Sequence, residues 1–210
     1  MMDVMEKVRE LKILPVIKID DAKDALPLAK ALIDGGLPAA EVTFRTDAAE
    51  ESIRAICAAY PDMLVGAGSL TSVEQAKAAY AAGAMFFVSA GFHRGVAEYA
   101  TENGIPYFPG ICTPSELMWL VEFGLPVAKF FPAGQMGGVK TIKAIAAAFP
   151  NMLFMPTGGV NAANIKEYLA YEKIIACGGS WMVKDTLINE GRFDEITRLT
   201  KEAMALIHGE

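Results

Sequence analysis

The chain alternates two kinds of segment along its length, and this alternation restricts the fold more than any other feature. Short runs of apolar or β-branched residues recur about every twenty residues, each followed by an alanine-rich amphipathic stretch and a glycine. The runs are typical of buried strands, and the stretches have the apolar spacing of helices. We therefore predict strands over residues 13–19, 39–45, 63–69, 85–90, 106–111, 127–131, 153–158 and 174–180.

Helix start and stop signals fall between these runs. Thr113 and Glu116 have the spacing of a capping box, and Pro114 stands at the first helical position. Eight strand–helix units with apolar strands predict a parallel sheet covered on both faces. With eight strands we expect the closed form, a (β/α)8 TIM barrel. Four glycines mark the expected ends of helices: Gly35, Gly83, Gly104 and Gly124.

The 210 residues suit one domain of this kind, and 53% of them are hydrophobic, which supplies a sizeable core. No proline-, glycine- or serine-rich linker divides the chain, so we predict a single barrel domain over residues 1–210. Residues 1–12 have the pattern of an amphipathic helix rather than a signal peptide, and we expect an extra N-terminal helix there.

Charge and residue usage exclude several classes of function. The net charge is −6 and no basic run is present, which disfavours binding to nucleic acid or to an anionic membrane. No apolar stretch approaches the roughly 18–20 residues of a membrane span, so we expect a cytoplasmic protein. Cys57, Cys112 and Cys177 lie far apart and are expected to stay reduced. Two histidines, His93 and His208, cannot build a histidine-rich zinc site, and no metal site is predicted.

Charged residues in the second predicted strand are the first candidates for an active site, because polar residues at the carboxyl ends of barrel strands form the active sites of this fold. Period-two alternation puts Glu41, Thr43 and Arg45 on one face, which we expect to point into the barrel. The alternative is that Glu41 and Arg45 pair with each other as a structural link.

A lysine inside an apolar run is the second candidate. Lys129 lies within Val127–Phe131. A buried ammonium ion loses its hydration, so burial favours the neutral amine, and a neutral amine attacks ketones to form a Schiff base. Arg45 could supply a second cation nearby that favours the neutral form further. The alternatives are that Lys129 reaches the barrel rim or neutralises Glu41.

Two glycine-rich turns follow the last two predicted strands, where this fold usually binds phosphate. The backbone at a glycine can approach an oxyanion closely, and N–H groups then bind it. Together with Lys129 and Glu41, these turns indicate Schiff-base chemistry on a phosphorylated ketone. Lys18, near the end of the first strand, could reach a substrate anion or simply solvent. The turn residues are Thr157, Gly158, Gly159, Gly178, Gly179 and Ser180.

Several motifs together resemble the bacterial 2-keto-3-deoxy-6-phosphogluconate (KDPG) aldolases, a family that includes 4-hydroxy-2-oxoglutarate (KHG) aldolases. The match runs in order from the first strand to the last helix. It is carried by the segments 41–46 (EVTFRT), 65–69 (VGAGS), 109–110 (PG), 113–116 (TPSE), 129–133 (KFFPA), 137–140 (GGVK), 156–160 (PTGGV) and 178–182 (GGSWM).

The resemblance implies a class I aldolase that needs no metal or other cofactor. Lys129 matches the Schiff-base lysine and Glu41 the general acid/base. Arg45 and Ser69 match residues that contact the pyruvate carboxylate, and Phe131 matches an aromatic wall beside the Schiff base. The glycine-rich turns, Thr157 to Gly159 and Gly178 to Ser180, match the phosphate end. Family members commonly form homotrimers. The implied substrates are a 2-keto-3-deoxy sugar acid phosphate and pyruvate.

Two positions depart from the family pattern. Ser69 stands where the family generally has threonine, and Ala90 stands where it usually has proline. Within the family, a KHG aldolase, a dual-activity enzyme and an enzyme for the epimeric galactonate substrate are alternatives. From other classes, a phosphate-binding barrel isomerase would not need Lys129, and a non-catalytic sugar-phosphate binder would tolerate its loss.

Overall fold

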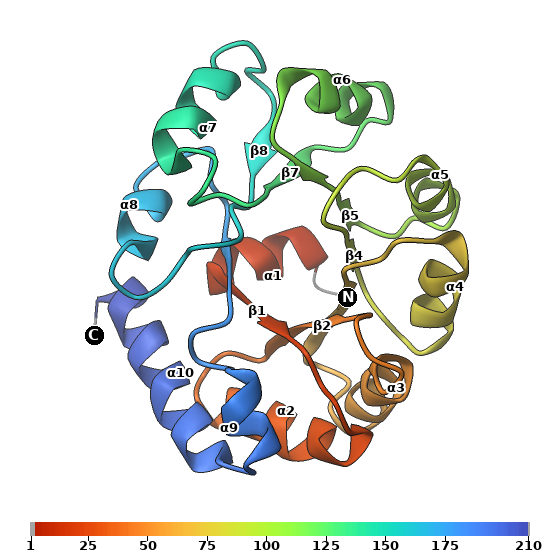
Figure 1. The fold of residues 1–210 in the computed structure, drawn as a ribbon, viewed down its shortest axis with the longest axis vertical. Helices are drawn as coiled ribbons and strands as arrows, with labels where there is room; N and C mark the ends of the chain where they lie inside the picture. The colour runs from red at the N-terminus through yellow and green to blue at the C-terminus, as the bar shows by residue number, and fades with distance from the viewer. Residues whose placement is uncertain (1–2, 210) are drawn as a thin grey trace.

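The computed structural model describes residues 3–209 and consists of parallel strands surrounded by helices (Figure 1). Each predicted strand segment contains an observed strand. The strands are β1 (Ile13–Ile17), β2 (Ala39–Thr43), β3 (Leu64–Gly68), β4 (Phe87–Val88), β5 (Tyr107–Phe108), β6 (Gly110–Ile111), β7 (Val127–Phe130), β8 (Leu153–Phe154) and β9 (Cys177–Gly179).

The strands form two parallel sheets that continue into one another. One sheet has the order β5-β4-β3-β2-β1-β9 and the other the order β6-β7-β8. Only Pro109, which has no N–H to donate, separates β5 from β6 within the single strand predicted over 106–111. Isolated parallel bridges, Phe154 to Ile174 and Thr157 to Gly178, join the region of β8 to that of β9. The fold is therefore a parallel, TIM-barrel-like α/β fold.

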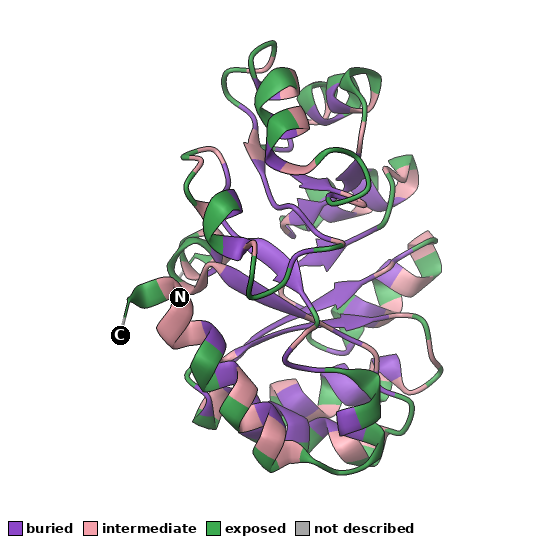
Figure 2. Cartoon of the chain, turned by 60° about the vertical axis from the view of Figure 1, so that its left-hand side comes forward, coloured by how far each residue is buried: buried purple, intermediate pink, exposed green. Residues whose placement is uncertain are grey.

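Helices α2 to α10 surround the strands in chain order in Figure 1, and α10 packs against α2, whereas α1 lies in the middle of this view. Their inward faces are buried and their outward faces exposed (Figure 2). The helices are α1 (Val4–Leu11), α2 (Ala25–Asp34), α3 (Ala49–Ala59), α4 (Val73–Ala81), α5 (Arg94–Glu102), α6 (Pro114–Glu122), α7 (Gly138–Ala146), α8 (Ile165–Leu169), α9 (Asp185–Asn189) and α10 (Phe193–His208), with a 3-10 turn at Ala22–Asp24.

The helix signals in the sequence are confirmed. The Thr113 side chain accepts from the backbone N–H of Glu116, and the Glu116 carboxylate accepts from the N–H of Thr113 at 2.8 Å. Gly104 and Gly124 follow α5 and α6 with φ +65 in both cases, a conformation that glycine adopts without strain. Helix α1 lies within the segment 1–12 expected to be helical, of which residues 1 and 2 are outside the described residues. Lys7 Nζ donates to the carbonyl of Asp62 at 2.9 Å.

Most observed strands end earlier than predicted, and the reason lies at their carboxyl ends. Strand β8 stops at Phe154 rather than 158, because Pro156 has no N–H and Gly158 and Gly159 turn the chain with φ +90 and +79. Strand β2 stops at Thr43 rather than 45. The residues beyond these ends form the loops that carry the candidate site. Within residues 3–209, no helix has the length and apolarity needed to cross a membrane.

Candidate active site

Strand β2 places a carboxylate inside the molecule. All five of its residues are buried, and Glu41 is 0% exposed. Glu41 lies in register with Val16 of β1 and Gly66 of β3. A Cβ atom on Gly68 would overlap the Glu41 carboxylate, so glycine at that position leaves the room that the carboxylate occupies. The predicted inward direction of Glu41 is confirmed.

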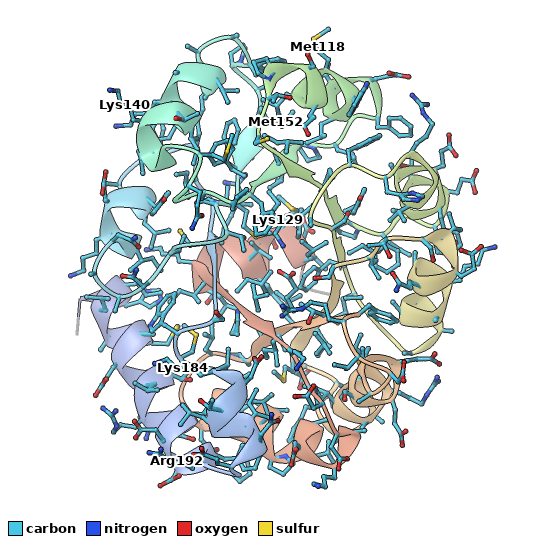
Figure 3. All side chains as sticks on the ribbon, viewed as in Figure 1. Met118, Lys129, Lys140, Met152, Lys184 and Arg192 are labelled. Carbon is cyan, nitrogen blue, oxygen red and sulfur yellow. The ribbon has the colours of Figure 1, made fainter. Side chains whose placement is uncertain are left out.

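Strand β7 brings Lys129 to this carboxylate. Lys129 is 4% exposed, and its Nζ donates to Glu41 Oε1 at 3.3 Å. The same Nζ lies 5.6 Å from the centroid of the Phe131 ring. Figure 3 shows Lys129 well inside the ring of helices, whereas Lys140 and Arg192 lie at the periphery. Lys129 therefore does not reach out to the rim, and it is the partner of Glu41.

Arg45 lies beyond the end of its strand, at the edge of the candidate site. Strand β2 ends before it, and the chain turns there because the Arg45 N–H donates to the carbonyl of Thr43 at 2.8 Å. Arg45 is exposed, and its Nε donates to Thr43 Oγ1 at 3.0 Å. Arg45 therefore lies at the mouth of the strands, bonded to Thr43 of the face predicted to point inward, and it lines the cavity there. The alternative of a Glu41–Arg45 link is wrong, since the ion pair of Glu41 is made with Lys129.

A cavity of about 300 Å³ lies at the carboxyl ends of β1, β8 and β9. Eight of the predicted site residues line it, and Phe131 connects it to Lys129. Three further residues that line the cavity, Val16, Val160 and Asp185, were not predicted. Val16 lies near the carboxyl end of β1, where this fold forms its active sites, so its position in the predicted strand was a usable signal. The eight predicted residues are Arg45, Phe131, Thr157, Gly158, Gly159, Gly178, Gly179 and Ser180.

The glycine-rich turns expose backbone donors to this cavity. The N–H groups of Gly158, Gly159 and Ser180 have no acceptor within residues 3–209. A Cβ atom on Gly178 would overlap the Thr157 hydroxyl, so this glycine allows the two turns to approach each other. Free N–H donors in glycine-rich turns beside a cavity are the groups that an oxyanion site requires.

Unsatisfied side-chain atoms point to the same region. Among the described residues, four buried side-chain oxygens have no hydrogen-bond partner, and two of them are Glu41 Oε2 and Thr157 Oγ1. An unpaired buried polar atom costs free energy. These two atoms are therefore available to a substrate or to water. Within residues 3–209, no three His, Cys, Asp or Glu side chains lie close enough together to form a metal site.

Ser69 lies just beyond β3 and outside the lining of the cavity. Its φ is +57, in the left-handed region that non-glycine residues adopt rarely and that is enriched at functional sites. The sequence predicted a site role for its hydroxyl, and the backbone conformation was not predictable from the pattern.

A family model described as "KDPG and KHG aldolase" matches residues 4–199. The chain belongs to this aldolase family. A 2-dehydro-3-deoxy-phosphogluconate aldolase from Treponema pallidum is 42% identical over 207 residues, which cover 99% of each chain. A KHG/KDPG aldolase from Escherichia coli K12 is 43% identical over 192 residues, covering 91% of this chain and 90% of the relative.

Solved structures of KDPG aldolases superpose on this family member over almost its whole length. That of Legionella pneumophila, which holds pyruvate as a covalent carbinolamine, has a TM-score of 0.91 at 37% identity and covers 96% of this chain and 98% of its own. The structure of the Zymomonas mobilis enzyme with 3-phosphoglycerate has a TM-score of 0.89 at 36% identity. The match covers 97% of this chain and 96% of the Zymomonas chain. The resemblance inferred from the motifs is confirmed.

Proposed function

We propose that this protein is a class I aldolase that cleaves KDPG to pyruvate and D-glyceraldehyde 3-phosphate. The observation that carries the proposal is the buried pair of Lys129 Nζ and Glu41 Oε1, 3.3 Å apart and adjoining a cavity with free backbone donors. An amine beside a carboxylate provides the nucleophile and the proton acceptor that Schiff-base chemistry requires.

The reaction begins at Lys129. Its Nζ adds to the C2 carbonyl of the substrate to give a carbinolamine, which loses water to form an iminium ion. Glu41 accepts the proton of the C4 hydroxyl, and the C3–C4 bond breaks. The family resemblance implies that a water molecule carries this proton. The electron pair moves into the iminium system as an enamine, and the aldehyde departs. Glu41 then returns a proton to C3, and water releases pyruvate from Lys129.

The remaining residues bind the two ends of the substrate. We assign the pyruvate carboxylate to Arg45 and the Ser69 hydroxyl, with Phe131 as the wall beside the Schiff base. We assign the phosphate to the turns Thr157 to Gly159 and Gly178 to Ser180, whose N–H groups support this role. These roles follow the motif match and remain proposals.

We further propose that residues 1–210 form one closed (β/α)8 barrel with the extra N-terminal helix α1, and that three copies assemble as a homotrimer in the cytoplasm. The bridges between the β8 and β9 regions support closure. Three apolar side chains of α6, Met118, Trp119 and Val121, are 61%, 43% and 57% exposed and offer a surface for contact between subunits. Sedimentation equilibrium tests the trimer.

Borohydride trapping with pyruvate tests the proposed chemistry. We expect a reduced pyruvate adduct on the peptide that contains Lys129, and Lys129→Met should abolish both adduct and turnover while the protein stays folded. Lys143→Met is a matched control, because Lys143 also lies over an aromatic ring, 5.3 Å from that of Tyr171, outside the site. An adduct on Lys18 would overturn the assignment of the lysine, and no adduct on folded protein would overturn the function.

The second candidate is cleavage of 4-hydroxy-2-oxoglutarate to pyruvate and glyoxylate, alone or beside KDPG cleavage. The 43% identity to the E. coli KHG/KDPG aldolase favours it. The ratio of kcat/KM for the two substrates decides between them.

A further inference from the structure

Thr43 is the last residue of β2, and its side chain joins two neighbouring parts of the site. It is 0% exposed, and its Oγ1 donates to the carbonyl of Ile17 in β1 at 2.8 Å. A hydroxyl group has one proton, so only its lone pairs remain for a further hydrogen bond. Arg45 uses them, because its Nε donates to Thr43 Oγ1 at 3.0 Å. The bond to Ile17 therefore turns the hydroxyl into a fixed acceptor for Arg45.

This arrangement leaves the outer end of the Arg45 guanidinium group available. Within residues 3–209, the bond to Thr43 is the only hydrogen bond of this side chain, so Nη1 and Nη2 have no acceptor. Arginine binds a carboxylate most strongly through two parallel N–H donors. Nη1 and Nη2 provide such a pair, and Thr43 holds the group by the one nitrogen that this pair does not use.

Arg45 lies between two hollows of the surface. It lines the 300 Å³ cavity and also a groove of about 450 Å³ at the amino ends of α3 and α4. Three carboxylates line this groove, those of Asp47, Glu50 and Glu74. Glu50 is paired with Arg54, whereas Asp47 and Glu74 form no ion pair within residues 3–209. The groove therefore offers Arg45 unpaired negative charge on the side away from the cavity.

The groove and a substrate carboxylate compete for the same N–H groups. Opposite charges a few ångströms apart attract each other even near the surface. A guanidinium group released from Thr43 would therefore turn toward Asp47 and Glu74. Within residues 3–209, Arg45 makes no ion pair with either carboxylate, and its bond to the Thr43 hydroxyl accounts for this.

We propose that Thr43 is a positioning residue, which holds Arg45 toward the cavity and away from the carboxylates of the groove so that Arg45 binds the carboxylate of a 2-keto acid. The inference rests on the proposed function, in which Arg45 binds the pyruvate carboxylate. Thr43 is buried and does not line the cavity, so it acts through Arg45.

Thr43→Val tests this inference, because it keeps the shape of the side chain and removes the hydroxyl. The measurement is the concentration of pyruvate that gives half-maximal borohydride trapping on Lys129, beside that of methyl pyruvate, whose ester carries no charge. The value for pyruvate should rise about tenfold or more, since a hydrogen bond to a charged group is lost. The value for methyl pyruvate should stay unchanged. Thr43→Ser keeps the hydroxyl and should restore pyruvate binding.

Thr197→Val is the matched control. The Thr197 hydroxyl also donates to a carbonyl of another element, that of Ala31 at 3.2 Å, but it lines neither the cavity nor the groove. Both trapping values should equal those of the unmutated protein. A rise for this variant as large as for Thr43→Val would overturn the inference.

A double-mutant cycle with Arg45→Met decides whether Thr43 acts through Arg45. Residues that act together have non-additive effects. In the Arg45→Met protein, Thr43→Val should therefore change the pyruvate value by less than about twofold. The same rise with and without Arg45 would overturn the inference. In the Thr43→Val protein, Asp47→Asn together with Glu74→Gln should return part of the lost affinity, and no recovery would overturn the role given to the groove.

The remaining outcomes are also decisive. An equal rise for pyruvate and methyl pyruvate would show a general distortion of the site, and no rise for either would show that the hydroxyl is dispensable; both overturn the inference. Thermal unfolding identifies a folding defect, in which case Thr43→Ala takes the place of Thr43→Val. Failure of the proposed function is a different result, because the unmutated protein would then form no pyruvate adduct.

Discussion

Burial of Lys129 and Glu41 is costly to the fold and useful to a reaction. Removing two charges from water is expensive, and their mutual attraction offsets this only with good geometry and with hydrogen bonds to the remaining atoms. Here one carboxylate oxygen, Glu41 Oε2, has no partner within residues 3–209. A pair built only for stability would satisfy both oxygens. The open oxygen is the position at which the proposed function has Glu41 accept a proton.

Glu41→Gln keeps the shape of this side chain and removes its ability to accept a proton. We expect kcat to fall by about two to four orders of magnitude. Borohydride should still trap some pyruvate on Lys129, because the amine remains. Steady-state kinetics and intact mass check both results. An unchanged kcat would remove Glu41 from its role.

Gly68→Ala should reduce activity through Glu41 alone. The added Cβ would overlap the Glu41 carboxylate, which must then move away from Lys129. We expect kcat to fall at least about tenfold, since a displacement near 1 Å at a reacting group has effects of this order or larger. Gly91→Ala is the control, because nothing lies within 4 Å of a Cβ there. Equal kinetics for the two variants would contradict the positioning of Glu41 by Gly68.

At the scale of elements, caps and turns determine where each strand and helix ends. The Glu116 carboxylate accepts the N–H groups of Cys112 and Thr113, both at 2.8 Å, at the start of α6. Burial raises the pKa of Glu116, but these hydrogen bonds outweigh burial and hold the pKa below its usual 4.5. Because the pKa is lowered in the folded state, the resulting stabilisation is present above pH 4.5 and is lost as the pH falls through the folded pKa.

Glu116→Gln should therefore lower the free energy of unfolding in a pH-dependent way. We expect a loss of about a few tenths of a kcal/mol at pH 7, because the group is only half-buried and solvent screens part of its charge. The difference from the unmutated protein should shrink as the pH falls through the folded pKa of Glu116, which lies below 4.5. Urea unfolding at a series of pH values measures it, with Glu102→Gln at an exposed position of α5 as control. A constant difference at all pH values would contradict the charge-based stabilisation.

At the scale of the whole molecule, the first and last strands hold each other in place. Ile13 of β1 is in register with Cys177 of β9, so residues far apart in the chain complete one sheet. Cys177 is 0% exposed, and burial raises the pKa of its thiol to about 12. Burial also raises the pKa of Cys57 to about 11. The three cysteines are free thiols, as predicted.

Modification of Cys177 should report unfolding of the entire domain. The thiolate is the reactive form, and at pH 8 neither the thiolate nor access to it is present in the folded protein. We expect iodoacetamide to modify Cys177 only at the rate of global unfolding, faster in urea, and to modify half-buried Cys112 first. Peptide mapping over time measures both rates. Modification of Cys177 as fast as of a free peptide would show that β9 opens locally.

Much of this protein could be predicted from local patterns. Hydrophobic period and glycine placement located the strand segments, and the capping box located the start of α6, because these signals act within a few residues. Lys129 and Glu41 were recognised as candidates because charge inside an apolar run is unusual in any fold. The ends of β2 and β8 were not predictable to the residue. Phe44 and Thr157 still donate to neighbouring strands beyond those ends, so the turns that follow decide where each strand stops.

By itself, the sequence determined which segments are buried as strands and which polar residues are candidates for chemistry, since side-chain polarity and periodicity are properties of the chain alone. Only the tertiary structure decided which groups meet. It paired Lys129 with Glu41 and brought Arg45 and Asp185 to one cavity. Those contacts join residues that are distant in sequence, so they depend on strand order and register, which no local pattern contains.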